Sequence, residues 1–210
     1  MPSYQLLSLD IWDTILRRDC HPDAIKVETA AVLLERHGGE LQEAYRNPRA
    51  LFRLRQEVER QLGAAKKAQG FDDEYAIQDV FRELLARAYR EPLPEAAAEE
   101  LAARLVREEL AAEKRHAYLD PGIVAKIDSI PHERLVCISD FYADEAFLRE
   151  LLTAAGFSKP LERVLVSCDF GVNKRSGRLF EEAEKLLNVT PAAHMHLGDN
   201  AYSDVEVPKR

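Results

Sequence analysis

Polar side chains that can do chemistry follow four short apolar runs of this sequence. Asp10 follows the first run, QLLSL, and Ser139 follows the second, RLVCI. Lys174 comes shortly after the third, RVLVS, and Gly198-Asp199 directly follows the fourth, HMHL. A carboxylate can attack phosphorus as a nucleophile, while a hydroxyl and an ammonium group can hold the phosphoryl oxygens. These residue types therefore predict phosphoryl-transfer chemistry.

Three aspartates in these clusters suit a divalent cation. Asp10, Asp199 and Asp204 carry hard oxygen donors, and Mg²⁺ binds one or two such carboxylates together with water and phosphate oxygens. Because a carboxylate and a phosphoryl group repel each other, a cation and Lys174 are both needed to bring them together. The expected cofactor is Mg²⁺, and the expected intermediate is an aspartyl-phosphate on Asp10.

The elements that would position these residues are strands that alternate with helices. After about residue 120, the apolar runs are separated by two helical segments, one from about 144 to 155 and one around 179–187. Such alternation predicts βαβ units and a parallel sheet, in which ligands bind at the carboxyl ends of the strands. The four polar clusters should therefore meet in one crevice.

The segment from about Pro22 to Tyr118 has helical periodicity. Apolar residues recur at spacings of three and four in the ranges 51–65, 77–88 and 101–110, and a first helix begins near Pro22 and ends at Gly38-Gly39. Four helices with mostly short connections predict a bundle-like unit.

Composition excludes several classes of function. The chain has 210 residues, of which 46% are hydrophobic and 31% charged, enough for one large domain or one domain with an insertion. A formal net charge of −8 argues against a nucleic-acid partner. No apolar run approaches the roughly 20 residues of a membrane span, and the N-terminus lacks the features of a signal peptide. Three cysteines without metal-like spacing fit a reduced, cytoplasmic protein.

The order of the motifs resembles that of the haloacid dehalogenase (HAD) superfamily. The matching motifs are a strand followed by Asp-x-x-x-Thr (Asp10, Thr14), a strand followed by Ser139, Lys174 ahead of a helix, and Gly-Asp-x-x-x-x-Asp (Gly198, Asp199, Asp204). The resemblance implies a Rossmann-like, doubly wound parallel α/β core made of residues 1–16 and 119–210, with an all-helical cap at 17–118. It also implies at least one further strand, so we expect a sheet short of an edge or a piece of a longer protein.

The resemblance implies a role for each matching residue. Asp10 would be the nucleophile and a Mg²⁺ ligand, and the backbone carbonyl of Trp12 and the carboxylate of Asp199 would be further ligands. Asp204 would support the metal shell, and Ser139 and Lys174 would hold the phosphoryl group. More narrowly, the stretches DIWDTILRR, ISDFY, NKRSGRLF and GDNAYSDV resemble HAD domains found with bacterial glycosyltransferases. A glycosyltransferase domain or partner is therefore expected.

Trp12 departs from the HAD pattern. HAD phosphatases carry a second aspartate at this position as general acid and base, and an indole cannot do that work. Losing a general acid costs about 10²–10⁴ in rate, or roughly 3–5 kcal/mol. Asp13 can replace it only if the turn redirects its side chain.

Other candidates have alternative explanations. Trp12 is a packing residue or stacks on substrate, and Asp140 forms a turn or contacts substrate. Arg17 and Arg18 are surface charges or meet an anionic substrate. We expect His194 and His196 to be structural, because no third metal ligand has suitable spacing.

Three functions compete at this point. The first is a Mg²⁺-dependent phosphohydrolase or phosphotransferase acting on a small phosphorylated metabolite such as a sugar phosphate. The second is a non-catalytic HAD-like module that binds a ligand or a glycosyltransferase, as the replaced acid suggests. The third is a 2-haloacid dehalogenase, since these enzymes have an aromatic residue at the same offset and need neither acid nor metal. The dehalogenase ranks third, because Gly198-Asp199 indicates a metal site that dehalogenases lack.

Overall fold

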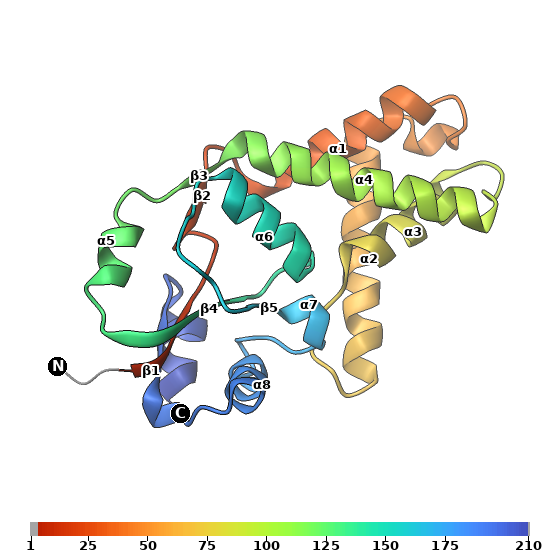
Figure 1. The fold of residues 1–210 in the computed structure, drawn as a ribbon. Helices are drawn as coiled ribbons and strands as arrows, with labels where there is room; N and C mark the ends of the chain where they lie inside the picture. The colour runs from red at the N-terminus through yellow and green to blue at the C-terminus, as the bar shows by residue number, and fades with distance from the viewer. Residues whose placement is uncertain (1–3, 210) are drawn as a thin grey trace. The chain divides into compact units, whose positions relative to one another are not determined.

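The chain forms two compact units (Figure 1). The computed structural model describes residues 4–209; residues 1–3 and 210, which fall within the expected core, lie outside the described residues. One unit holds the chain up to Arg18 and from Ala117 onward, and the other runs from Asp19 to His116. The boundaries expected from the sequence, at 17 and 118, fall inside a short strand pair formed by β2 (Leu16–Arg18) and β3 (Ala117–Leu119).

The first unit is built on a four-stranded parallel sheet. Its order is β5-β4-β1-β6, formed by β1 (Tyr4–Leu9), β4 (His132–Ser139), β5 (Val164–Val166) and β6 (His194–Leu197). Residues 6–9 of β1 are buried on both faces, as expected of a central strand in a parallel sheet. All four strands predicted from the sequence are present, with parallel pairing.

Helices cover both sides of this sheet. In Figure 1, α6 (Glu145–Ala154) and α8 (Arg178–Leu187) lie on opposite sides of the strands. The α8 side contains a core cluster whose members come from β1, β4, β5 and α8, among them Leu6, Val136, Ile138, Leu165, Leu179, Phe180, Ala183 and Leu187. The predicted doubly wound α/β class is confirmed. The unit also contains α5 (Ile123–Asp128).

Two local features differ from the sequence prediction. The third apolar run was expected to be extended through Ser167, but the strand stops at Val166 and a helical turn, α7 (Ser167–Phe170), begins. The buried Ser167 hydroxyl accepts a hydrogen bond from the Phe141 backbone N–H (3.0 Å), which favours the turn over a longer strand. The β2–β3 pair was not expected, because three-residue strands carry too little pattern to detect.

The second unit is a four-helix bundle. Its helices are α1 (Pro22–His37), α2 (Pro48–Ala68), α3 (Ile77–Ala88) and α4 (Glu95–His116); α1 packs on α2 and α4, and α3 packs on the same two helices. Asn47 caps α2 by accepting hydrogen bonds from the next backbone N–H groups. The buried Arg55 pairs with Glu59 and Glu109 inside the bundle. No helix among residues 4–209 is long and apolar enough to cross a membrane.

Candidate active site

Asp10 lies at the carboxyl end of the central strand β1. Its backbone N–H donates to the Leu197 carbonyl on β6 (2.9 Å), and only 6% of its surface is exposed. Ser139 ends the neighbouring strand β4, and Asp199 follows β6 by two residues. Because parallel strands end at one edge of the sheet, these residues come from adjacent chain segments at that edge.

Lys174 joins two of the carboxylates. Its Nζ donates to Asp10 Oδ1 (2.6 Å) and to Asp204 Oδ1 (2.7 Å), and Asp140 accepts its backbone N–H (2.8 Å). Burial by itself would lower the pKa of Lys174, but the charges of Asp10 and Asp204 hold it above its usual value. Burial raises the pKa of Asp10 to about 6, although Lys174 opposes that shift. Because Asp140 accepts the Lys174 backbone N–H, it positions the loop that carries the lysine.

Asp204 is held by the loop that precedes it. It lies in the helical segment η3 (Ala201–Glu206), and its Oδ2 accepts a hydrogen bond from Asn200 N–H (3.0 Å). Any side chain at Gly198 would collide with the Asp204 carboxylate, so glycine is required there. Burial would raise the pKa of Asp204, but hydrogen bonds from His196 and Lys174 hold it well below its usual value. This carboxylate is therefore fixed in place and ionised.

Three carboxylates are close enough to share a cation. One oxygen from each of Asp10, Asp199 and Asp204 lies within 4.8 Å of the other two. Burial is the main cause that raises the pKa of Asp199, and the charges of Asp13 and Asp204 raise it further. Three hard oxygen donors with an excess of negative charge suit Mg²⁺. The residues present fit this ion.

Three buried polar atoms near these residues in sequence make no hydrogen bond within residues 4–209. They are Ser139 Oγ, Thr14 Oγ1 and Trp12 Nε1. A buried donor without a partner costs about 1–3 kcal/mol, so such groups are rare unless a ligand or water satisfies them. The unused hydroxyls of Ser139 and Thr14 are available to an anionic ligand.

No protein-family model matches this chain, and no curated protein sequence matches it either. Solved structures do. A 2-haloacid dehalogenase from Pseudomonas syringae superposes with a TM-score of 0.68 at 18% identity, over 98% of this chain and 82% of that one. The chain has the HAD fold. The HAD-hydrolase YfnB from Bacillus subtilis, bound to magnesium, gives 0.56 at 17% identity, over 99% of this chain and 85% of that one. L-2-haloacid dehalogenase from Xanthobacter autotrophicus superposes with a TM-score of 0.53 at 16% sequence identity, over 98% of this chain and 74% of that one.

The turn after the HAD-type aspartate explains how Trp12 is placed. The Ile11 carbonyl accepts hydrogen bonds from Ile15 N–H and Leu16 N–H, and Asp13 takes the left-handed conformation (φ 57°). The indole of Trp12 packs against Phe141, with ring centroids 5.6 Å apart. The guanidinium carbon of Arg18 lies 3.2 Å from the centre of the same ring. The Trp12 indole therefore packs against the Phe141 ring and also stacks with the Arg18 guanidinium.

The other candidates from this turn line one cavity of the HAD core. This cavity of about 330 Å³ is lined by Asp13, Thr14, Arg17, Asp120, Lys126 and Asp199, among others. Arg17 is not available as a lone cation, because its Nε donates to Asp120 Oδ2 (2.7 Å). Asp13 is exposed and lines the same cavity as Asp199. Lys126, which belongs to none of the sequence motifs, adds a cation to the wall of this cavity.

A row of buried hydrogen bonds behind the site was missed from the sequence. Ser8 Oγ lies 2.7 Å from His194 Nε2 and 2.7 Å from His196 Nδ1, and His194 Nδ1 lies 2.9 Å from Glu184. His196 Nε2 lies 3.2 Å from Asp204 Oδ1. Burial lowers the pKa of His196 to about 4, so its neutral ring donates to Asp204 and accepts from Ser8. The sequence shows a serine inside an apolar strand and two histidines on one face of another, but it does not show that the two strands pair in this register.

Proposed function

We propose that this chain is a Mg²⁺-dependent phosphohydrolase or phosphotransferase that acts on a small phosphorylated metabolite through Asp10. The contact that carries this proposal is the one between Lys174 Nζ and Asp10 Oδ1 (2.6 Å), beside Asp199 and Asp204. A buried lysine on a carboxylate nucleophile reduces its repulsion for an anionic phosphoryl group.

The proposed reaction has two displacements at phosphorus. A carboxylate oxygen of Asp10 attacks phosphorus, the bond from phosphorus to the leaving oxygen breaks, and that oxygen keeps the electron pair. Water, or another acceptor hydroxyl, then attacks the same phosphorus, which releases the Asp10 carboxylate and passes a proton to the phosphate product or to solvent. Ser139 and Lys174 would donate hydrogen bonds to the phosphoryl oxygens during both steps.

Asp10, Asp199 and Asp204 would hold the Mg²⁺ ion, and the Trp12 carbonyl is the further ligand that the HAD resemblance implies. The ion would supply positive charge that stabilises the charge on the phosphoryl oxygens. The three carboxylates would fix the position of the ion. Hydrogen bonds from the Asn200 N–H and from His196 keep the Asp204 carboxylate in place.

Trp12 narrows the substrate class. A leaving alkoxide needs a proton at the transition state, and an indole N–H is far too weak an acid to supply one. A phosphate leaving group (from an anhydride) or a carboxylate leaving group (from an acyl phosphate) departs as a stable anion and has little need of that proton. The favoured substrates are therefore phosphoric anhydrides or acyl phosphates rather than simple sugar monoesters, unless Asp13 replaces the missing acid.

Phosphate release with and without Mg²⁺ tests the proposal. We expect turnover of acetyl phosphate that is abolished by a chelator and reduced to background by Asp10→Asn, which keeps the shape but not the nucleophile. Unchanged phosphate release by Asp10→Asn would overturn it. The absence of both turnover and a beryllofluoride adduct would favour the non-catalytic module, with a glycosyltransferase as its proposed partner.

A second candidate is a 2-haloacid dehalogenase. Trp12 favours it, because displacement of halide from carbon needs no general acid, and two of the similar structures carry that name. Asp10 would attack the carbon that bears the halogen, the halide would leave with the bonding electrons, and water would hydrolyse the resulting ester. Halide release from 2-chloropropionate that persists with a chelator would replace the first proposal with this one.

A further inference from the structure

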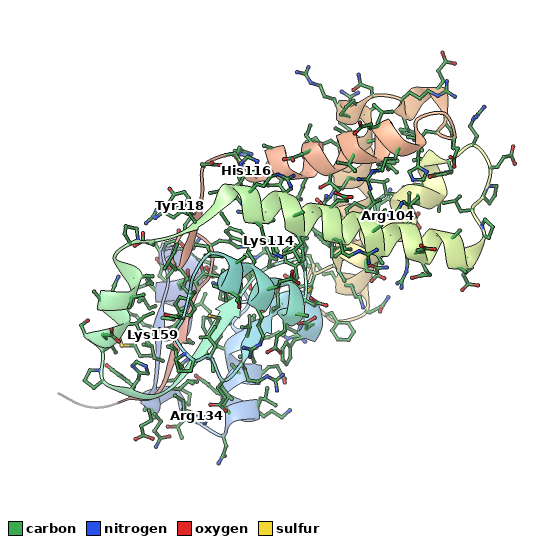
Figure 2. The ribbon with its side chains drawn as sticks, turned by 45° about the horizontal axis from the view of Figure 1, so that its top comes forward. Arg104, Lys114, His116, Tyr118, Arg134 and Lys159 are labelled. Atoms are coloured by element: carbon green, nitrogen blue, oxygen red, sulfur yellow. The ribbon has the colours of Figure 1, made fainter. Side chains whose placement is uncertain are left out.

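A second cluster of metal-ligating side chains lies at the two ends of the helical unit. Asp19 and Cys20 directly precede α1, and His116 is the last residue of α4, labelled at the end of that helix in Figure 2. One ligand atom from each of these three side chains lies within 4.8 Å of the other two. None of the three belongs to the site around Asp10.

We propose that Asp19, Cys20 and His116 form a Zn²⁺ site. The cluster combines a carboxylate, a thiol and an imidazole, whereas the cluster at Asp10 contains carboxylates alone. Sulfur and nitrogen ligands select a borderline-soft ion such as Zn²⁺, while Mg²⁺ prefers oxygen. Three protein ligands leave the fourth tetrahedral position to water, which fits a site whose side chains are partly exposed.

The backbone holds the ligands together before any ion binds. The Asp19 N–H donates to the His116 carbonyl (3.1 Å), and the adjacent pair Arg18 and Ala117 ends the β2–β3 ladder. The two ligand-bearing segments, 97 residues apart in sequence, are therefore already in register.

The imidazole of His116 lies between two carboxylates, one of which is a candidate ligand. Its Nδ1 is hydrogen-bonded to Asp19 Oδ1 (2.7 Å), and a bound ion would displace the proton that these two atoms share. Its Nε2 lies 3.5 Å from Glu28 Oε2. Glu28 is itself held by Arg115. A carboxylate that accepts Nε2–H fixes the tautomer whose Nδ1 lone pair can bind metal. Glu28 would thus orient the ring without being a ligand.

A bound ion would cross-link the two ends of the helical bundle. Closing a loop of this length restricts the unfolded chain, and an ion that binds only the folded state raises the melting temperature with its concentration. The expected role is structural: Zn²⁺ would stabilise the entry and exit of the helical unit. This role does not depend on the chemistry proposed for Asp10.

Cobalt(II) titration gives a direct test, because a thiolate bound to Co²⁺ produces an intense charge-transfer absorption in the near ultraviolet that oxygen ligands do not. Cys168 supplies a matched control: it is also half-buried and lies next to an aspartate, with its Sγ 3.9 Å from Asp169 Oδ1. Within residues 4–209, no metal-ligating cluster includes Cys168.

The wild-type chain and the Cys168→Ser variant should show the band, and ZnCl₂ should displace it and raise the melting temperature. Cys20→Ser should lose the band, and His116→Gln should weaken cobalt binding about tenfold or more. The proposal is wrong if the band is absent from the wild-type chain, if it persists in Cys20→Ser, or if Cys168→Ser removes it.

Discussion

The Lys174 ammonium lies 2.6 Å from Asp10 Oδ1, so the candidate nucleophile is ion-paired at the carboxyl end of β1. The same ammonium lies 2.7 Å from Asp204 Oδ1. One buried cation therefore balances two buried carboxylates, and both the stability of this region and the proposed chemistry depend on it. The cost of desolvating each charge is offset only while all three are present.

Removal of the lysine charge should destabilise the fold. In Lys174→Met, Asp10 and Asp204 would remain as buried carboxylates without their cation, and the free energy of unfolding should fall by about 3–5 kcal/mol. Urea unfolding measures this loss. The control is Arg175→Met, which removes a cation from the neighbouring, exposed position and should cost less than about 1 kcal/mol. Equal losses of unfolding free energy in the two variants would show that the buried ion pairs of Lys174 stabilise the fold no more than an exposed pair does.

Trp12→Asp should restore the missing general acid. An aspartate at this position can protonate an alkoxide leaving group, so turnover of an alkyl phosphate should rise by about tenfold or more, while acetyl phosphate turnover changes little. The matched control is Trp12→Asn, which has the same size and loses the same packing on Phe141 and Arg18 but carries no acidic proton. If both variants gain equally on the alkyl phosphate, the gain comes from space and not from acid catalysis.

The parallel sheet could be predicted from the sequence because its strands are buried, apolar and separated by amphipathic helices. The same logic placed Asp10, Ser139 and Asp199 together, since residues that follow parallel strands share one edge. The α7 turn and the β2–β3 pair could not be predicted in this way. Each depends on a few residues whose conformation is set by tertiary hydrogen bonds, such as those between Ser167 and Phe141.

The partners of the site residues were also beyond sequence reasoning. Arg18 reaches Trp12 only because the chain reverses tightly after Ile11, and Ser8 reaches two histidines only because β1 pairs with β6 in one particular register, Ser8 opposite His196. Register is a property of the folded sheet, and a slip of one residue would place these side chains on opposite faces. Spacing along the chain contains no such information.

Ser8→Ala should destabilise the fold through that register. The variant would leave His194 Nε2 and His196 Nδ1 buried without the hydroxyl that joins them, and it should lower the free energy of unfolding by about 1–3 kcal/mol. Chemical denaturation provides the measurement. Ser129→Ala is the control, because that hydroxyl bonds the Lys126 carbonyl at an exposed position. A loss for Ser8→Ala no greater than for Ser129→Ala would contradict a structural role for the histidine row.

Glu145 should make stability depend on pH. Burial alone would raise the pKa of its carboxyl, but hydrogen bonds from the Arg149 guanidinium and the Val164 N–H hold it below its ordinary value of 4.5. A carboxylate with a lowered pKa stabilises the folded state above the unfolded value, and this stabilisation is lost as the pH falls through the folded value. Glu145→Gln should therefore destabilise the protein by about 1 kcal/mol at pH 7.

Because the pKa of Glu145 is lowered in the folded state, the stability difference between the wild type and Glu145→Gln should disappear at low pH. As the pH falls from 4.5 through the lower folded pKa, the wild-type carboxyl takes up its proton, so the free energies of unfolding of the wild type and Glu145→Gln should converge. The contributions of the other carboxyl groups cancel because both proteins share them. Urea unfolding at pH 7, 5 and 3.5 measures the difference. Glu150→Gln, at an exposed position of the same helix, should differ from wild type by less than about 0.5 kcal/mol at pH 7. A Glu145→Gln difference that stays constant down to pH 3.5 would mean that packing, and not the carboxylate charge, joins α6 to β5.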